Sequence, residues 1–143
     1  MSYVIDASVA VKWFFSHELN AMQAVALSND EPLLIAPDLL VTETCSAAWK
    51  WFRLGRINAD ELIEIAERVP LFFDELVGAA ELAPRAVAIA NALAHPVYDC
   101  FYLALAEARG IPLITADARL LGRIADTPWA ARVRRLADYR PTA

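Results

Sequence analysis

The feature that most constrains the fold is a repeated alternation of short apolar segments with longer segments of helical pattern. Three uninterrupted apolar segments, at 2–5, 33–36 and 111–115, are each followed closely by a sequence with helical periodicity. Strands without polar alternation are typical of parallel sheets that helices cover on both faces. The sequence therefore predicts an α/β fold, a three-layer α/β/α sandwich with a mainly parallel central sheet.

Start and stop signals delimit the expected helices. Asp38 is a plausible N-cap, Asn58 followed by Glu61 suits a capping box, and Gly110 is placed to end a helix. Pro84 is expected in the first turn of its helix, where proline is tolerated. We expect helices directly after Asp6 and over 18–29, 38–54, 58–69, 80–94, 98–109 and 118–121. The segment 71–77 favours a further strand, with a continued helix as the alternative, and 132–136 favours an edge strand.

Length and composition predict a single domain spanning residues 1–143. A hydrophobic content of 58% indicates a large core and a buried self-association surface. No apolar stretch approaches the roughly 20 residues of a membrane-spanning helix, and the N-terminus lacks the pattern of a signal peptide. We therefore expect a soluble, cytoplasmic protein, in which Cys45 and Cys100 are reduced core thiols.

Acidic residues occupy positions that suit a ligand site. Asp6 and Asp117 follow two of the apolar segments, and the carboxyl ends of neighbouring parallel strands meet at one edge of a sheet. Asp99 opens an apolar helix, so we expect its carboxylate on a core-facing side. Glu43 lies inside the helix 38–54. Its neighbours on the same helix face, Ala47 and Lys50, would equally suit an exposed glutamate.

Each acid also has an ordinary structural explanation. Asp6, Asp99 and Asp117 could all be helix caps, and Glu43 could be a solvated surface residue. If the four converge, their mutual repulsion requires a cation. Ligation by oxygen alone selects Mg²⁺ or Mn²⁺, and the matching chemistry is hydrolysis of a phosphodiester by metal-activated water. The net charge of −5 would be unusual for a nucleic-acid binder, but cations at the four acids would leave the rest of the chain close to neutral.

The ordered set of motifs resembles that of the PIN-domain ribonucleases, and most closely the VapC-type toxins of toxin-antitoxin modules. The resemblance rests on VIDAS at 4–8, the mid-helix Glu43, YDCFYLALA at 98–106 and LITAD at 113–117. It implies a PIN-like sandwich, endonucleolytic cleavage of RNA, homodimerisation and inhibition by a cognate antitoxin protein.

The resemblance also implies functional residues. Asp6, Glu43, Asp99 and Asp117 would be the catalytic residues and the ligands of Mg²⁺ or Mn²⁺. Ser8 and Thr115 match the supporting hydroxyl positions, although Ser8 could equally be an ordinary hydroxyl in a helix first turn. Asp38 and Glu31 are alternatives to Glu43 as the fourth acid. After Asp117 the sequence departs from many relatives, which leaves any additional ligand open.

Other polar and aromatic residues suggest weaker roles. Trp13, Trp49, Trp51 and Phe52 could stack on bases but more naturally form core or dimer contacts, and no ligand role is expected for His17 or His95. Basic charge that could meet an RNA backbone or form a solvated, salt-bridged face gathers at Arg119, Arg123, Arg132, Arg134, Arg135 and Arg140.

Two other functions are compatible with parts of the pattern. The main alternative is a catalytically silent PIN-like module that binds RNA or protein, in which the acids serve only as caps. A phosphatase of the haloacid-dehalogenase type also begins with an aspartate after its first strand. It requires a second aspartate two residues later, where this chain has Ser8.

Overall fold

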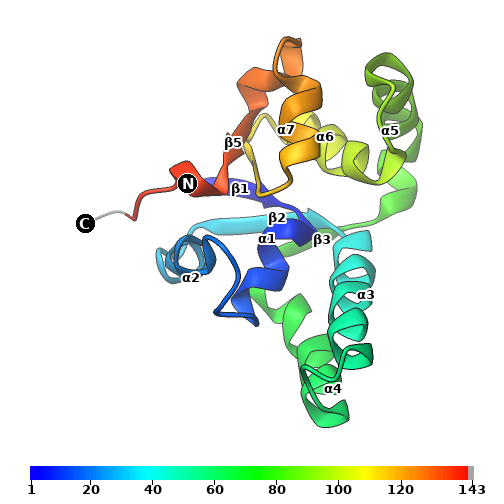
Figure 1. Ribbon diagram of the computed structural model, residues 1–143. Helices are drawn as coiled ribbons and strands as arrows, with labels where there is room; N and C mark the ends of the chain where they lie inside the picture. Colours follow the sequence, from blue (N-terminus) through cyan, green and yellow to red (C-terminus); the bar gives the residue numbers. More distant parts are fainter. Residues whose placement is uncertain (142–143) are drawn as a thin grey trace.

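A parallel sheet forms the centre of the molecule. The computed structural model describes residues 1–141, in which five strands pair in the order β3-β2-β1-β4-β5, all parallel (Figure 1). The central position of β1 is evident from Val4, which pairs with Ile35 on one side and with Leu113 on the other. The strands are β1 (Ser2–Ile5), β2 (Leu33–Pro37), β3 (Glu75–Val77), β4 (Leu113–Thr115) and β5 (Val133–Arg135).

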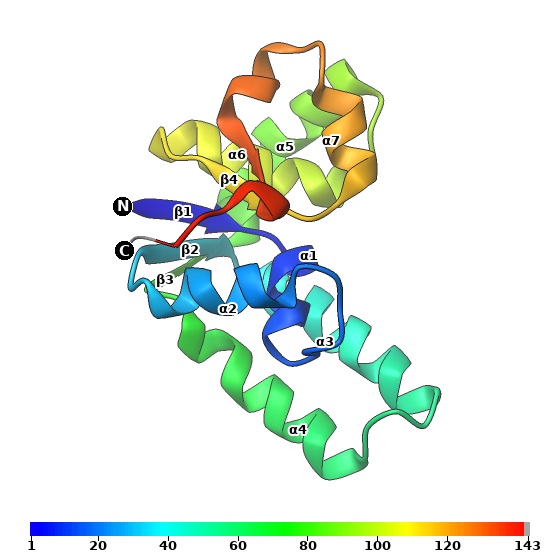
Figure 2. The ribbon, with the colours of Figure 1, turned by 60° about the vertical axis from the view of Figure 1, so that its left-hand side comes forward.

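Helices cover both faces of this sheet and complete the three layers. Helices α5, α6 and α7 lie on one side and α1 to α4 on the other, with α3 and α4 extending away from the sheet as a pair (Figures 1 and 2). The α-helices are α1 (Ala7–Ala10), α2 (Ala21–Asn29), α3 (Leu39–Arg53), α4 (Ala59–Arg68), α5 (Ala79–Leu93), α6 (Val97–Arg109) and α7 (Ala118–Ile124). Short 3₁₀ turns are η1 (Val11–Trp13), η2 (Val69–Phe72), η3 (Pro128–Arg132) and η4 (Leu136–Asp138).

The first strand shows why the apolar segments have no polar alternation. Val4 packs into a hydrophobic cluster with α6, whereas Tyr3 and Ile5 pack into a second cluster with α2. Because successive side chains of a strand point to opposite faces, both faces of β1 are buried. The expectation of a three-layer sandwich with a parallel sheet is confirmed.

The capping signals were largely predictive. The Asn58 side chain accepts from the Glu61 N–H at 2.8 Å while the Glu61 carboxylate accepts from the Asn58 N–H at 3.1 Å, which completes the capping box. Gly110 ends α6 at a φ of 64°, a conformation that favours glycine. Cys100 is buried, Cys45 is partly buried, and both are free thiols. None of the helices within residues 1–141 is long and apolar enough to cross a membrane.

Several expected boundaries were wrong. The helix expected from residue 18 begins at Ala21, because Asn20 adopts a left-handed conformation with φ 63°. The segment 71–77 contains a 3₁₀ turn, and only its last three residues form β3. Since α5 begins at Ala79, Pro84 lies beyond its first turn. Asp38 makes no capping bond to its own helix and instead accepts from the backbone N–H of Ala79 at 3.0 Å.

Candidate metal-binding active site

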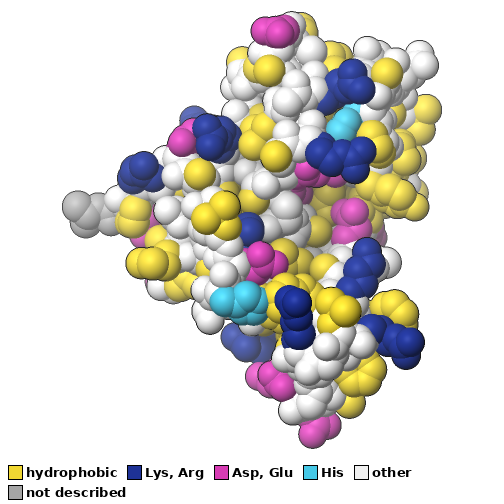
Figure 3. All heavy atoms as spheres, viewed as in Figure 1, with side chains coloured by type: hydrophobic (Ala, Val, Ile, Leu, Met, Phe, Trp, Pro, Cys, Tyr) yellow, Lys and Arg dark blue, Asp and Glu magenta, His cyan; other side chains and the backbone are white. Residues whose placement is uncertain are grey.

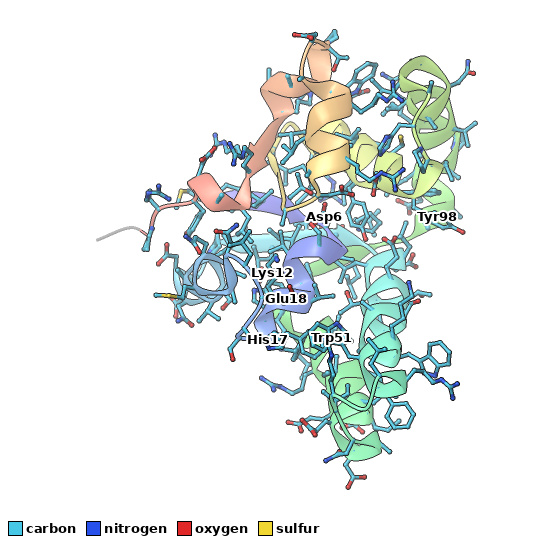
Figure 4. The ribbon with its side chains drawn as sticks, in the orientation of Figure 1. Asp6, Lys12, His17, Glu18, Trp51 and Tyr98 are labelled. Atoms are coloured by element: carbon cyan, nitrogen blue, oxygen red, sulfur yellow. The ribbon has the colours of Figure 1, made fainter. Side chains whose placement is uncertain are left out.

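The predicted site begins at the carboxyl edge of the sheet. Strands β1 and β4 are neighbours, with Ile5 paired to Ile114, so Asp6 and Asp117 follow adjacent strands at the same edge. This adjacency had been an assumption of the sequence interpretation, and the register establishes it. Figure 4 shows Asp6 at this edge, between the helices of the two outer layers.

Asp6 is the most buried of the four acids, with only 3% of its surface exposed. Its Oδ1 accepts from the Ser8 hydroxyl at 2.5 Å, and its Oδ2 accepts from the Thr115 hydroxyl. Oδ1 also accepts from the backbone N–H of Val9, so Asp6 caps α1 in addition. Burial, with a smaller contribution from the charge of Asp99, raises the pKa of Asp6 to about 7, although hydrogen bonds from the Ser8 and Thr115 hydroxyls oppose this shift.

The two hydroxyls connect Asp6 to the turn that follows β4. The Ser8 oxygen accepts from the backbone N–H of Ala116 at 2.9 Å, and the Thr115 oxygen accepts from that of Asp117 at 3.0 Å. Ser8 lies in the first turn of α1, as its ordinary explanation required, yet its hydroxyl also bonds the carboxylate. Ser8 and Thr115 therefore fix the position of the Asp6 carboxylate.

Glu43 is not a solvated surface glutamate. Its side chain is partly buried, and its Oε1 accepts from the hydroxyl of Tyr102, a residue that is 1% exposed, at 2.6 Å. Burial raises the pKa of Glu43, and the charge of Asp99 adds to this shift. The alternative acids Asp38 and Glu31 are both exposed. Sequence reasoning missed Tyr102 as a functional partner because it resembles any other apolar residue of a buried helix.

Asp99 lies in the first turn of α6, and its side chain is partly buried, with 24% of its surface exposed. Its Oδ2 lies 2.6 Å from Nε2 of His95, whose side chain is only 6% exposed. His95 therefore has an acidic partner that was not predicted from the sequence. The spacing of four residues between His95 and Asp99 was the available signal.

Asp117 combines a capping role with its place at the sheet edge. Its Oδ1 accepts from the backbone N–H groups of Arg119 at 2.9 Å and Leu120 at 3.3 Å, which caps α7. Its connection to Asp6 is indirect and runs through the Thr115 hydroxyl. The capping alternative thus holds for Asp6 and Asp117, but not for Asp99, for which no capping bond exists within residues 1–141.

Three of the acids interact electrostatically, since the charge of Asp99 contributes to the raised pKa of both Asp6 and Glu43. In the described part of the chain, however, no three Asp, Glu, His or Cys side chains are placed closely enough to hold one ion. Mutual repulsion among carboxylates favours such separation, and a cation would oppose it. By type, the donor set consists of carboxylate and hydroxyl oxygens, which fits a hard divalent cation such as Mg²⁺ or Mn²⁺.

The surface around these elements has a mixed charge pattern. In Figure 3, acidic side chains gather in the notch between the α5–α7 layer and the projecting α3, with Lys and Arg side chains on both sides. The anionic groups inside the notch suit a bound cation. The cationic groups along its rims suit a polyanionic backbone.

The weaker sequence candidates are mostly accounted for by packing. Trp13 stacks on Phe72 at 4.2 Å and donates to the Ala24 carbonyl, and Trp51 stacks on Phe15 at 4.6 Å. His17 contacts the ring of Trp51, which Figure 4 shows beside it. Of the basic residues near the C-terminus, Arg134, Arg135 and Arg140 line a separate cavity with Met1 and Tyr3.

Comparison with known proteins agrees with this fold. Residues 3–126 match the family model of the PIN domain. The chain therefore belongs to the PIN-domain family. Within that family it resembles Ribonuclease VapC3 of Pyrobaculum aerophilum, to which it is 33% identical over 122 residues, covering 84% of this chain and 92% of that protein.

Two solved structures share the fold. The crystal structure of PAE2754 from Pyrobaculum aerophilum superposes with a TM-score of 0.68 at 23% identity, covering 96% of this chain and 85% of that one. VapBC2 from Rickettsia felis, bound to a DNA fragment from their promoter, superposes with a TM-score of 0.64 at 9% identity, covering 94% of this chain and 98% of that one. At these identities the superpositions establish the architecture.

Proposed function

We propose that this chain is a divalent-metal-dependent endoribonuclease and the toxin component of a toxin-antitoxin pair. The observation that carries the proposal is the buried Asp6 carboxylate, held by two hydroxyls at the sheet edge and electrostatically coupled to Asp99. Membership of the PIN-domain family and the similarity to Ribonuclease VapC3 support it. The domain would comprise residues 1–143.

Asp6, Glu43, Asp99 and Asp117 would hold the cation. When bound, Mg²⁺ or Mn²⁺ supplies Lewis-acid stabilisation of the phosphodiester and lowers the pKa of the attacking water. The chain's own contribution is to orient the carboxylates. Four side chains orient three of the acids through hydrogen bonds. Ser8 and Thr115 bond Asp6. Tyr102 bonds Glu43, and His95 bonds Asp99.

The partners follow from the same proposal. The substrate is RNA, the inhibitor is a cognate antitoxin protein, and the chain acts as a homodimer in the cytoplasm. The similarity to the VapBC2 fold and to Ribonuclease VapC3 supports the antitoxin and the RNA substrate. Several large apolar residues are exposed on the α3–α4 pair, and they support a self-association surface. They are Trp49 in α3, Leu54 at the end of α3 and Ile63 in α4.

The direct test is cleavage of RNA by the purified chain in Mg²⁺ or Mn²⁺, with and without EDTA. We expect cleavage to stop in EDTA and to fall strongly in Asp6→Asn and Asp99→Asn. Asp60→Asn, an exposed acid in the first turn of α4, is the matched control and should cleave normally. Undiminished cleavage by Asp6→Asn and Asp99→Asn would reject the proposed site, and absence of cleavage by the wild-type chain would favour the catalytically silent binding module.

A further inference from the structure

A groove of about 460 Å³ leads away from the acids along α3. It is lined by Glu43, Ser46, Lys50 and Trp51 of this helix, and by Tyr98 from the first turn of α6. Since Glu43 belongs to both the acid site and the groove, the two are continuous. When a bond of a linear polymer lies at the acids, the part of the polymer next to that bond must lie either in this groove or on the opposite side of the acids.

Tyr98 provides an unpaired aromatic face in this groove. It is 63% exposed, which is unusual for a large aromatic residue, and its ring has no aromatic neighbour within residues 1–141. Trp51 differs, because Phe15 stacks on it and the guanidinium of Arg56 lies 4.7 Å from its ring centroid. Of the two aromatic rings that line this groove, Tyr98 is therefore the one on which a base can stack, whereas Trp51 forms part of the wall of the groove. In Figure 4, Tyr98 lies near the start of α6, and Trp51 lies further down, beside α3 and His17.

Charge along the groove changes from anionic to cationic. Glu43 lies at one end and the exposed Lys50 lies seven residues further along the same face of α3, about 10 Å along the helix axis. This order suits a polyanion whose reacting phosphate meets a cation at the acids and whose next phosphates meet Lys50. The polar Ser46 between them can accept or donate hydrogen bonds to sugar or base edges.

We propose that this groove binds a single-stranded segment of RNA beside the cleaved bond, with one base stacked on Tyr98 and a phosphate paired with Lys50. A single strand is required because bases within a duplex do not expose their faces to a side chain. The inference rests on the proposed ribonuclease function, since it assigns the substrate's path from the same acids. Tyr98 acts as a binding residue that discriminates unpaired from paired RNA.

The test measures RNA affinity separately from cleavage. All variants are made in an Asp6→Asn background, and fluorescence anisotropy follows binding of a labelled single-stranded RNA oligonucleotide and of a duplex of the same sequence. Tyr98→Ala should weaken binding of the single strand by about 5- to 150-fold, the range expected for one base–aromatic stack. Tyr98→Phe should bind as the parent does, and duplex binding should not change in either. Lys50→Gln should reduce the salt dependence of binding by about 0.7 in log–log slope.

Val87→Ala is the control, because Val87 is 57% exposed on α5 but does not line the groove. Equal losses in Val87→Ala and Tyr98→Ala, or no loss in Tyr98→Ala, overturn the inference, even if the wild-type chain cleaves RNA in an EDTA-sensitive way. If the wild type cleaves no RNA but Tyr98-dependent binding of single strands persists, the groove assignment stands and the proposed catalytic function fails.

Discussion

His95 and Asp99 form the closest contact between an imidazole and a carboxylate within residues 1–141, with 2.6 Å between Nε2 and Oδ2. His95 precedes α6 and Asp99 lies in its first turn, so this bond fixes one oxygen of the carboxylate. An ionised carboxylate accepts hydrogen bonds, and the buried imidazole therefore donates from Nε2.

Loss of this donor should weaken metal binding more than folding. We expect His95→Ala to lower divalent-metal affinity and cleavage by about 10- to 100-fold, the usual effect of removing a residue that orients a metal ligand. His95→Gln, which retains an N–H donor, should recover part of the loss. Titration with Mn²⁺, together with thermal unfolding to verify the fold, makes the measurement. Equal affinities in His95→Ala and the wild type would contradict the assigned role.

A second prediction concerns the tyrosine that bonds Glu43. Tyr102→Phe removes the hydroxyl 2.6 Å from Oε1 and leaves the buried ring in place, so the fold should survive while cleavage falls. Glu43→Gln should reduce cleavage at least as much. Glu31→Gln and Asp38→Asn test the alternative acids and should retain activity, because both side chains are exposed. An inactive Glu31→Gln beside an active Glu43→Gln would move the fourth ligand to Glu31.

The raised pKa of Asp6 predicts a pH dependence of stability without metal. Between the ordinary value of 3.8 and about 7, the folded state binds a proton that the unfolded state has released. The contribution of Asp6 to stability is therefore fully present below pH 3.8 and is lost as the pH rises to about 7. Asp6→Asn should remove this loss, so its free energy of unfolding relative to wild type should be greater at pH 8 than at pH 5, by on the order of a few kcal/mol.

The measurement is urea unfolding of both proteins in EDTA at the two pH values. Ser8→Ala provides a check of the sign, because the Ser8 hydroxyl favours the ionised form of Asp6. Its removal should raise the pKa of Asp6 further and deepen the loss of stability at pH 8. Parallel pH profiles for wild type and Asp6→Asn would show that burial does not penalise the Asp6 charge.

A fourth prediction concerns Thr44 in α3, whose buried hydroxyl oxygen has no hydrogen-bond partner within residues 1–141. Valine has nearly the same shape and carries no polar group. Thr44→Val should therefore raise the free energy of unfolding by about 1 kcal/mol, since the cost of burying an unpaired hydroxyl disappears. Thr42→Val, at an exposed position of the same helix, is the control and should change stability little. Destabilisation by Thr44→Val would reveal a partner for this hydroxyl.

The strands and most helices were predictable because their signals are local. The apolar segments gave β1, β2 and β4, and the capping residues gave the ends of α4 and α6. The late start of α2 was not predictable, because it depends on a left-handed Asn20, a conformation that asparagine tolerates but does not require.

The site was predictable only in part, for a related reason. The order of motifs indicated Asp6, Asp99 and Asp117, whereas their hydrogen-bond partners depend on tertiary contacts. Tyr102 bonds Glu43 across 59 residues of sequence, and no local sequence pattern predicts such a contact. The pairing of His95 with Asp99 depends on the break between α5 and α6, where Ala94 adopts a left-handed conformation with φ 51°.

The bond between Thr115 and Asp6 joins residues separated by 109 positions, because β1 lies at the centre of the sheet and its neighbour β4 comes late in the chain. At synthesis rates of about 5 to 20 residues per second, the ribosome makes Asp6 roughly 5 to 20 s before the hydroxyl that fixes it. A nascent chain that stalls before β4 carries the acids of the first half without the strand that completes their setting. Assembly of the site is thus a late event in translation.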